Sequence, residues 1–348
     1  MSLLPAAGRF AARRGSLAAV LIPQRLDALV CCSPHDCAWL TGNYSLAPVT
    51  CVDGEWLALA PGSHACQRVT RGHRRGCFRL GVTGAMPAGE LSLWTTEFPG
   101  LTVVDCSPAV SRLRATKDAA ELRHLAGAAA ATEAALSDLE RQLRPGLTEL
   151  DVKHLLETAI ESRTGQGLSF DASIGSAERA SLVWARPTLR RLGPGDPVVV
   201  DAGARLQGYC ADMSRTYILG GPVTASGAIA RQATELIEEI REEVLASLRP
   251  GVRASLLAEV ARQAATRAGA AAGLGMPHAI GHGIGLEVHE RPYLTTSSDD
   301  VIDVNMVIAI EPGLYARGTG GARIEDMVVV TADGYRTLTE TGVTSSSP

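Results

Sequence analysis

Four acidic residues interrupt or end the most apolar segments in the second half of this chain, and they restrict its folding more than any other feature. Asp201 follows three valines, Asp212 lies beyond a turn that contains Gly208, Glu311 follows the run VIAI, and Glu325 shortly precedes MVVV. An isolated carboxylate in such a strand would lose several kcal/mol of hydration unless a cation or another partner met it. We therefore expect the strands to bring these acids to shared positive charge.

Two divalent metal ions are the simplest source of that charge. Arg215 and Arg323 could neutralise two of the four acids but not all of them. Each divalent ion adds two positive charges, and a carboxylate can bridge both ions. We expect His282, in PHAIGHGIGLEVHE, to be the fifth ligand, because its flanking glycines would leave room for a metal or a substrate at the backbone. This oxygen-rich donor set favours Mn, Co or Fe, with Zn also possible, over a thiolate zinc centre.

The order of helical and strand-like segments predicts two domains in the 348 residues. Residues 1–114 alternate short β-like runs, such as ALVCC and LTVVD, with helical pieces, which predicts a small α/β domain. Residues 115–348 combine four helix-forming segments with the strand-like runs PVVVDAGA, CADMSRTYIL, MVIAIEPGLY and ARIEDMVVVT. The helical segments are 116–143, 148–163 (opened by a Thr148-x-x-Asp151 capping pattern), 228–248 and 255–269. This domain is expected to be α+β, with helices covering one face of a largely antiparallel sheet.

A repeat within the second domain indicates an internal duplication. RPGLTELDVKHLLETAIESR starts at Arg144 and RPGVRASLLAEVARQAATRAG starts at Arg249. Each opens with Arg-Pro-Gly and continues as an amphipathic helix.

Composition narrows the partners and the compartment. The formal charge of -4 argues against a dedicated nucleic-acid-binding protein. The chain contains no run of eighteen apolar residues, so no membrane-spanning helix is expected. The N-terminus lacks the long apolar region and the cleavage site of a secretory signal. An amphipathic first helix accounts for Arg9, Arg13 and Arg14 as well as a transit peptide does, so a cytoplasmic protein is expected. The eight cysteines lack CxxC spacing, which favours reduced, mostly buried thiols. The partners are therefore expected to be small or neutral.

The blocks VVVDAGA, ADMSRT, GHGIGLEVHE, IAIEPGLY and ARIEDMVVVT, in this order, resemble the pita-bread metallohydrolases. These include Xaa-Pro aminopeptidases, Xaa-Pro dipeptidases, methionine aminopeptidases and creatinase relatives. The resemblance covers residues 115 to 340, and the upstream DALVCCSPHDCAWLTGNY is similar to the N-terminal domain of the prolidase and creatinase branch. It implies a pita-bread catalytic domain after a creatinase-like domain, cleavage of an amide bond near the N-terminus of a small peptide or amide substrate, and a homodimer.

The resemblance also implies a role for each site residue. Asp201 would chelate one metal, Asp212 and Glu325 would bridge both, and His282 with Glu311 would complete the second. Glu311 would also take the proton of the attacking water. We expect four further residues at the substrate: His289 and His278 in the pocket, Trp184 in its wall, and Arg323, which resembles the arginine that orients the last glutamate.

The chain departs from the family pattern at Trp184. In SLVWARPTLRR, Val183-Trp184 stands where the family commonly has Pro-His, whose imidazole contacts the scissile amide. An indole cannot accept a proton and offers one N–H donor. Protonation or positioning of the leaving nitrogen would then depend on His278 or His289, or the substrate would differ from that of the family. Two alternatives follow: a metal-dependent hydrolase of a small non-peptide amide or cyclic metabolite, and a non-catalytic pita-bread binding module.

Overall fold

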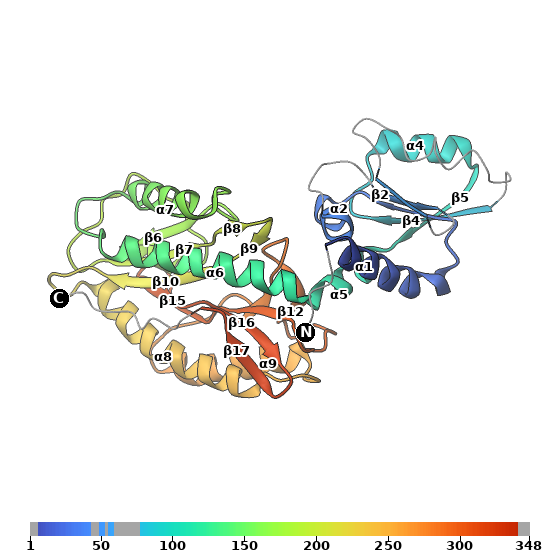
Figure 1. Ribbon diagram of the computed structural model, residues 1–348. Helices are drawn as coiled ribbons and strands as arrows, with labels where there is room; N and C mark the ends of the chain where they lie inside the picture. The colour runs from blue at the N-terminus through green and yellow to red at the C-terminus, as the bar shows by residue number, and fades with distance from the viewer. Residues whose placement is uncertain (1–5, 43–48, 53–54, 59–76, 340–348) are drawn as a thin grey trace. The chain divides into compact units, whose positions relative to one another are not determined.

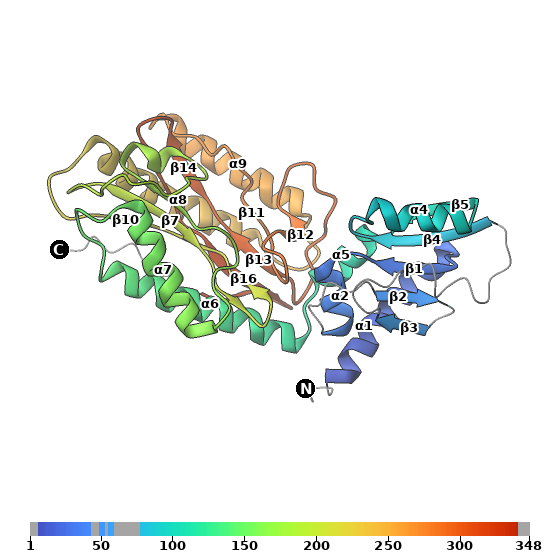
Figure 2. The same cartoon turned by 90° about the horizontal axis from the view of Figure 1, so that it is seen from above.

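The computed structural model describes residues 6–42, 49–52, 55–58 and 77–339. The chain divides into two compact units, Met1–Arg114 and Ala115–Pro348, which carry different chain colours in Figures 1 and 2. Within the described ranges, no helix combines the length and the apolar character that a membrane span requires.

The first unit is the predicted small α/β structure, built on a mixed sheet. Its strand order is β3-β2-β1-β4-β5, in which β1 pairs antiparallel with β2 and parallel with β4, and β4 pairs parallel with β5. The strands are β1 (Ala28–Cys31), β2 (Val49–Val52), β3 (Glu55–Ala58), β4 (Cys77–Thr83) and β5 (Gly100–Asp105). The helices are α1 (Ala6–Leu21), η1 (Ile22–Gln24), α2 (Pro34–Thr41), α4 (Ala88–Glu97) and α5 (Ser107–Ala115).

Cys31, Cys37, Cys106 and Cys210 are buried and Cys32 is partly exposed, and these five cysteines are not in disulfide bonds. Burial raises the pKa of Cys31 well above its usual value and that of Cys32 to about 11, so both thiols stay protonated at neutral pH. The side chains of Cys51, Cys66 and Cys77 lie outside the described residues, as do Asn43 and Tyr44 of the N-terminal segment.

The second unit contains the four expected helices: α6 (Ala119–Glu140), α7 (Glu149–Thr164), α8 (Ala225–Ser247) and α9 (Ala254–Ala270). The predicted Thr148-x-x-Asp151 capping box is confirmed, because each of these side chains accepts a hydrogen bond from the other residue's backbone N–H. Asp118 and Glu121 form a second capping box at the start of α6.

Antiparallel sheets make up the rest of the second unit. A three-stranded sheet has the order β10-β7-β6, and a five-stranded sheet has the order β12-β11-β13-β16-β17. These strands are β6 (Ser173–Ser176), β7 (Pro197–Ala202), β10 (Met213–Ile218), β11 (Gly281–Gly283), β12 (Glu290–Tyr293), β13 (Val307–Ile310), β16 (Asp326–Thr331) and β17 (Gly334–Thr337). Two hairpins, β8 (Arg205–Leu206) with β9 (Tyr209–Cys210) and β14 (Gly313–Ala316) with β15 (Gly320–Arg323), and a 3-10 helix, η2 (Ala177–Ser181), complete it.

Two of the expected strands are broken at their acidic residue. MVIAIEPGLY divides into β13 and β14 around Glu311, and ARIEDMVVVT divides into β15 and β16 around Glu325. Asp212 likewise lies just before β10, and only Asp201 is inside a strand, at the penultimate position of β7. The four acids therefore lie at or just beyond strand ends, where the backbone leaves the hydrogen-bonded ladder of its sheet.

Backbone hydrogen bonds support the internal duplication. Gly146 N–H donates to the carbonyl of Leu192 and Gly251 N–H to that of Ile302, both over 2.8 Å. Leu192 and Ile302 are 110 residues apart in the chain, and the same separation relates Asp201, in β7, to Glu311, which directly follows β13. The β7–β10 and β13–β16 pairs are both antiparallel, and their second strands are preceded directly by Asp212 and Glu325, respectively. Each half thus contributes one acid from each strand of an equivalent pair.

Each half has its own apolar core. Leu136 and Leu156 of α6 and α7 pack with Val200 of β7, whereas Ile237 of α8 packs with Val328 of β16. Figure 2 shows α6 with α7 and α8 with α9 as two helix pairs flanking the strands. These cores hold the strand ends that carry the acids.

Candidate metal centre and substrate pocket

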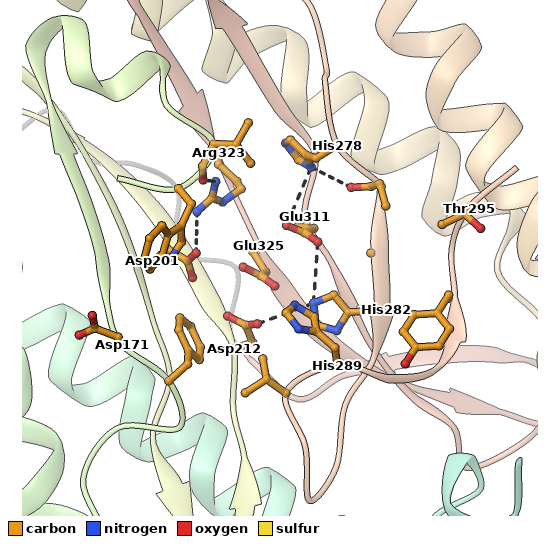
Figure 3. A pocket seen from close by; sticks show the side chains of 17 residues that line it. Asp171, Asp201, Asp212, His278, His282, His289, Thr295, Glu311, Arg323 and Glu325 are labelled. Carbon is orange, nitrogen blue, oxygen red and sulfur yellow. Dashed lines mark hydrogen bonds and ion pairs between the residues drawn. The ribbon is translucent and has the colours of Figure 1, made fainter. Parts of the chain in front are cut away.

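The second unit contains a pocket of about 660 Å³ at these strand ends (Figure 3). All nine residues expected at the site line it: Trp184, Asp201, Asp212, His278, His282, His289, Glu311, Arg323 and Glu325. The structure therefore brings together residues that are spread over more than a hundred positions of the chain.

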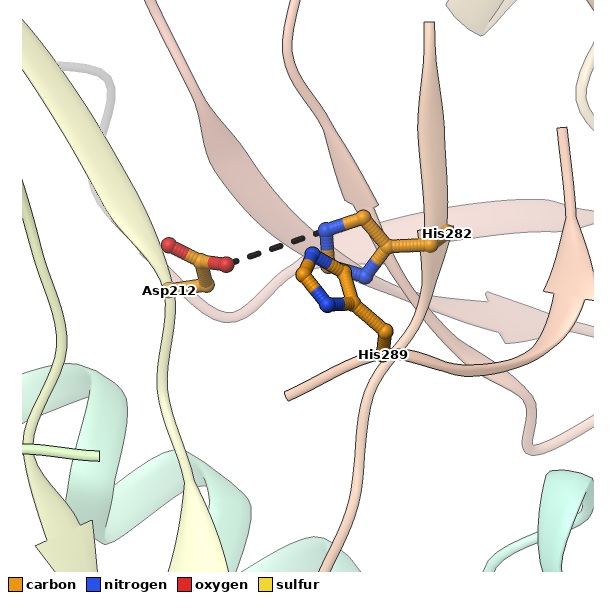
Figure 4. A group of neighbouring side chains, drawn as sticks. All are labelled: Asp212, His282 and His289. Carbon is orange, nitrogen blue, oxygen red and sulfur yellow. Dashed lines mark ion pairs between the residues drawn. The ribbon is translucent and has the colours of Figure 1, made fainter. Parts of the chain in front are cut away.

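The metal-ligand candidates form overlapping groups rather than one ring. Ligand atoms of Asp201, Asp212 and Glu325 lie within 4.8 Å of one another, and so do those of His282, Glu311 and Glu325. Glu325 belongs to both groups, which is the arrangement that two neighbouring ions with a shared carboxylate require. A third group joins Asp212, His282 and His289 (Figure 4).

The distances within the cluster suit a cation better than direct hydrogen bonds. His282 Nε2 lies 3.7 Å from Asp212 Oδ2 and 3.8 Å from Glu311 Oε1. Both separations exceed a hydrogen bond, whereas two ligand atoms on one ion at about 2.1 Å lie roughly 3 to 4 Å apart. His282 Nδ1 lies 3.1 Å from the carbonyl of Gly283, to which it can donate a proton, leaving the lone pair of Nε2 toward the carboxylates.

Unpaired buried oxygens provide an independent test of the metal hypothesis. Asp201 Oδ1, Asp212 Oδ1 and Glu325 Oε1 are buried and accept no hydrogen bond. Asp212 is 5% exposed and Glu325 only 1%. Because a buried carboxylate oxygen without a donor is costly, the residues fit a site for cations.

The titration of the metal-free cluster is consistent with this fit. Burial and the neighbouring acids raise the pKa values of Asp212 and Glu325 well above their usual range, and burial raises the pKa of Glu311 to about 7. Burial lowers the pKa of His282 to about 4, which keeps its imidazole neutral as a metal ligand must be. Without cations the cluster therefore retains protons that metal binding would displace.

Arg323 joins the two carboxylate groups, but not in the way expected. Its guanidinium is 2% exposed and donates to Asp201 Oδ2 over 2.6 Å. It reaches Glu325 only through Ser214, whose hydroxyl accepts from Arg323 Nε and donates to Glu325 Oε2, both over 2.8 Å. Arg323 thus pairs directly with Asp201 and holds the last glutamate indirectly.

Arg215 does not neutralise any of the four acids. Its guanidinium pairs with the Asp326 carboxylate over 2.7 Å and binds the backbone carbonyl, not the side chain, of Glu325. In β10, Arg215 points to the opposite face from Ser214, because side chains alternate along a strand.

The glycines around His282 have a different cause from the one expected. A Cβ at Gly281 would lie 2.0 Å from the Ala309 carbonyl oxygen, and one at Gly283 would lie 2.1 Å from that of Arg291. The space is filled by the backbones on either side of β11, not by a metal or a substrate. Close strand approach therefore requires both glycines.

His278 and His289 lie on the same side of the pocket. His278 Nδ1 can donate to the carbonyl of Ala279 over 2.8 Å, while its buried Nε2 has no partner. Burial lowers the pKa of His278 to about 4, so Nε2 is a neutral acceptor. His289 is exposed and packs edge-on against His282, with 4.3 Å between ring centroids.

Several residues of this pocket were not expected from the sequence. Phe170, Asp171, Tyr293 and Thr295 line the pocket from loops or strand ends, where no motif indicates them. Ser214 could have been found, because it lies two residues after Asp212 and the alternation of a strand places both on one face.

The comparisons with known proteins agree with this geometry. The model of metallopeptidase family M24 matches residues 123–332. The chain is 30% identical to the uncharacterized peptidase YqhT of Bacillus subtilis over 266 residues, which cover 76% of this chain and 73% of that protein. It is 34% identical to an Xaa-Pro dipeptidase of Lactobacillus helveticus over 247 residues, 70% of this chain and 66% of that protein.

Solved structures show the same fold over nearly the whole chain. The dipeptidase PepE from Mycobacterium ulcerans has a TM-score of 0.84 at 28% identity, with 99% of both chains covered. The prolidase from Pyrococcus furiosus has a TM-score of 0.83 at 23% identity, covering 93% of this chain and 99% of that one. The fold is therefore the pita-bread fold, and the chain belongs to metallopeptidase family M24 as a metallopeptidase-like hydrolase whose family uses divalent metals.

Proposed function

We propose that this protein is a dinuclear metallopeptidase that cleaves the amide bond after the first residue of Xaa-Pro substrates. Asp201, Asp212, His282, Glu311 and Glu325 are the proposed ligands. The observation that carries this proposal is the pair of ligand groups that share Glu325 and contain three buried carboxylate oxygens without partners. The Xaa-Pro dipeptidase among the relatives supports the substrate class.

The metals would supply positive charge that activates a water molecule and polarises the substrate carbonyl. The chain's own residues do the rest. Glu311 lies at the edge of the cluster, 4.0 Å from His278, and accepts the proton of the attacking water. His278 and His289 orient the substrate amide by hydrogen bonds. Trp184 supplies no proton acceptor, so positioning of the leaving nitrogen falls to these two histidines.

Mn, Co or Fe suits the oxygen-rich ligand set best, and Zn is the further candidate. The homodimer implied by the family resemblance and the cytoplasmic location stay predictions. The comparisons do not favour a non-peptide substrate or a binding module without activity.

A metal and substrate matrix tests the proposed function. Metal-stripped protein is reloaded separately with Mn, Co, Fe(II) or Zn, its metal content is measured, and it is assayed on Xaa-Pro dipeptides, Xaa-Pro tripeptides and matched Xaa-Ala peptides. We expect turnover of Xaa-Pro peptides at two ions per chain, and loss of both the second ion and turnover in Asp212→Asn. Protein with two bound ions that cleaves none of these peptides would refute the proposal.

A further inference from the structure

A buried lysine contacts the side chain of the residue that follows His289. The chain has only two lysines, and Lys117 is one of them. It is 2% exposed, and its Nζ lies 3.4 Å from Oε2 of Glu290, which is 4% exposed. Burial strips both charges of water, so each needs an opposite charge in the interior. Lys117 therefore balances a negative charge directly beside His289, although 173 residues separate Lys117 from Glu290.

The Glu290 carboxylate closes the turn that precedes His289. Its Oε1 accepts the N–H of Glu287 over 3.0 Å, and the N–H of Gly285 donates to the Glu287 carbonyl over 3.0 Å. A Cβ at Gly285 would lie 2.6 Å from Glu290 Oε2 and 2.7 Å from Oε1. The glycine therefore lets the carboxylate pack against the backbone of the turn. One carboxylate thus binds Lys117 through Oε2 and the turn through Oε1.

Backbone hydrogen bonds attach the two ends of this turn to the metal-ligand strands. The carbonyl of Gly285 accepts the N–H of Cys210 over 2.7 Å, and Cys210 ends β9 two residues before Asp212. At the other end, Glu290 begins β12 and pairs with Gly283 of β11. Both ends are thereby fixed, and the Glu290 side chain determines the conformation of the residues between them.

The position of His289 depends on this turn. Its imidazole is exposed, and no residue in the described ranges forms a hydrogen bond with the ring. The ring packs edge-on against His282, with 4.3 Å between ring centroids, and lies in one group with Asp212 (Figure 4). A displacement of the turn would therefore displace the imidazole relative to the cluster. A misplacement of about 1 Å can lower a catalysed rate by roughly 100-fold.

The backbone of Lys117 is held independently of its side chain. Its N–H donates to the Asn305 carbonyl over 3.0 Å, and Thr116 forms an isolated antiparallel bridge with Met306. A substitution of the Lys117 side chain leaves these backbone contacts in place. A buried ion pair also adds little net stability in many proteins, because lost hydration offsets the attraction. The pair is therefore better suited to select the conformation of the turn than to hold the fold together.

We infer that Lys117 is a positioning residue, which holds His289 against His282 through the carboxylate of Glu290. This inference rests on the proposed function for the role of His289 at the substrate, and it adds to that site a residue from the start of the second unit. Lys117 is not among the described residues that line the pocket, so it acts on the reaction only through the turn.

Steady-state kinetics of metal-loaded variants on Ala-Pro tests this inference. Lys117→Met, which removes the ammonium, should lower kcat about 10-fold or more, change KM less than about 3-fold and keep the metal content of wild type. The double variant Lys117→Met with Glu290→Gln should recover most of kcat. It buries no unpaired charge, and its amide oxygen still accepts the Glu287 N–H.

Two further variants separate the turn from a general loss of an ion pair. Gly285→Ala leaves Lys117 in place and displaces the same carboxylate, so it should reproduce the loss of kcat even if Lys117→Met does not fold. Arg267→Met, which breaks an exposed ion pair with Glu243 in the same unit, is the control and should leave kcat and KM unchanged. Wild-type kcat in both Lys117→Met and Gly285→Ala would overturn the inference.

Hydrogen exchange gives a second readout that needs no turnover. In Lys117→Met and in Gly285→Ala, the amides of residues 284–289 should exchange at least about 10-fold faster than in wild type, while those of β13 and β16 keep their protection. The His289 imidazole resonance, identified by its loss in His289→Asn, should shift in both variants. If wild type cleaves no dipeptide, these changes still support the positioning role, and the failure belongs to the proposed function. Unchanged exchange in the turn, or equal loosening of the whole second unit, would overturn the inference with or without turnover.

Discussion

The metal-free protein should become more stable as the pH falls from 8 to 6.5, the opposite of ordinary acid denaturation. Burial raises the pKa of Glu311 from an unfolded value of 4.5 to about 7, and the pKa values of Asp212 and Glu325 move in the same direction. An acid whose folded pKa is raised costs stability once the pH exceeds its unfolded pKa. The cost is complete above the folded pKa and is recovered as the pH falls through it.

Glu311 and the two buried histidines largely cancel between pH 8 and 6.5. The shift of the Glu311 pKa from 4.5 to about 7 corresponds to roughly 3 kcal/mol of lost stability at pH 8, of which about 0.8 kcal/mol returns by pH 6.5. Burial lowers the pKa values of His278 and His282 from 6.5 to about 4, so at pH 6.5 the unfolded chain binds protons that the folded imidazoles do not, which costs about 0.4 kcal/mol for each. The net gain therefore comes from Asp212 and Glu325, and below pH 6.5 the histidines oppose it more strongly.

Urea denaturation of metal-stripped protein, followed by circular dichroism at pH 6.5, 7, 7.5 and 8, measures the effect. The metal-loaded protein is the internal control and should show the reverse slope, because protons compete with cations for the same oxygens. Asp212→Asn should flatten the slope of the stripped protein. A free energy of unfolding that stays constant or rises from pH 6.5 to 8 without metal would refute the electrostatic reasoning.

Three further substitutions test the connections around the cluster. Arg323→Lys keeps the charge but cannot reach Asp201, Ser214 and the Val183 carbonyl together, so we expect a loss of about 3 kcal/mol in unfolding free energy and weaker metal retention. Ser214→Ala removes the link to Glu325 and should weaken metal binding by about 1 to 2 kcal/mol in calorimetry, whereas Ser214→Thr, which keeps the hydroxyl, should restore it. Glu149 accepts hydrogen bonds from the backbone N–H groups of Ser176 and Thr188, which lie on either side of the segment that carries Trp184. Glu149→Gln should therefore lower the free energy of unfolding in urea by about 1 to 3 kcal/mol and raise KM more than it lowers kcat, because it disturbs the pocket wall and not the metal ligands. A fall in kcat alone would contradict this last prediction.

Local features of the sequence were enough for the helices and for the list of metal-ligand candidates. The capping boxes around Thr148 and Asp118 depend on residues three apart, so their signals are complete within one turn. The four acids stand out because a carboxylate in an apolar strand needs a partner in any register. The Arg-Pro-Gly repeat likewise indicates a duplication without reference to strand pairing, because both copies are visible in the sequence itself.

The tertiary structure decided which groups meet. Arg323 and Asp201 are 122 residues apart in the chain, and Ser214 and Glu325 are 111 apart. No short-range pattern specifies such partners, because register and strand order set them. The same reason explains why Arg215, which by its position in the sequence could neutralise one of the four acids, pairs with Asp326 instead, and why the glycines beside His282 serve strand packing. The orientation of Trp184 and the position of Asp171 also depend on loop packing, so residue types were enough to propose the chemistry of a metal centre but not to predict the shape of the pocket.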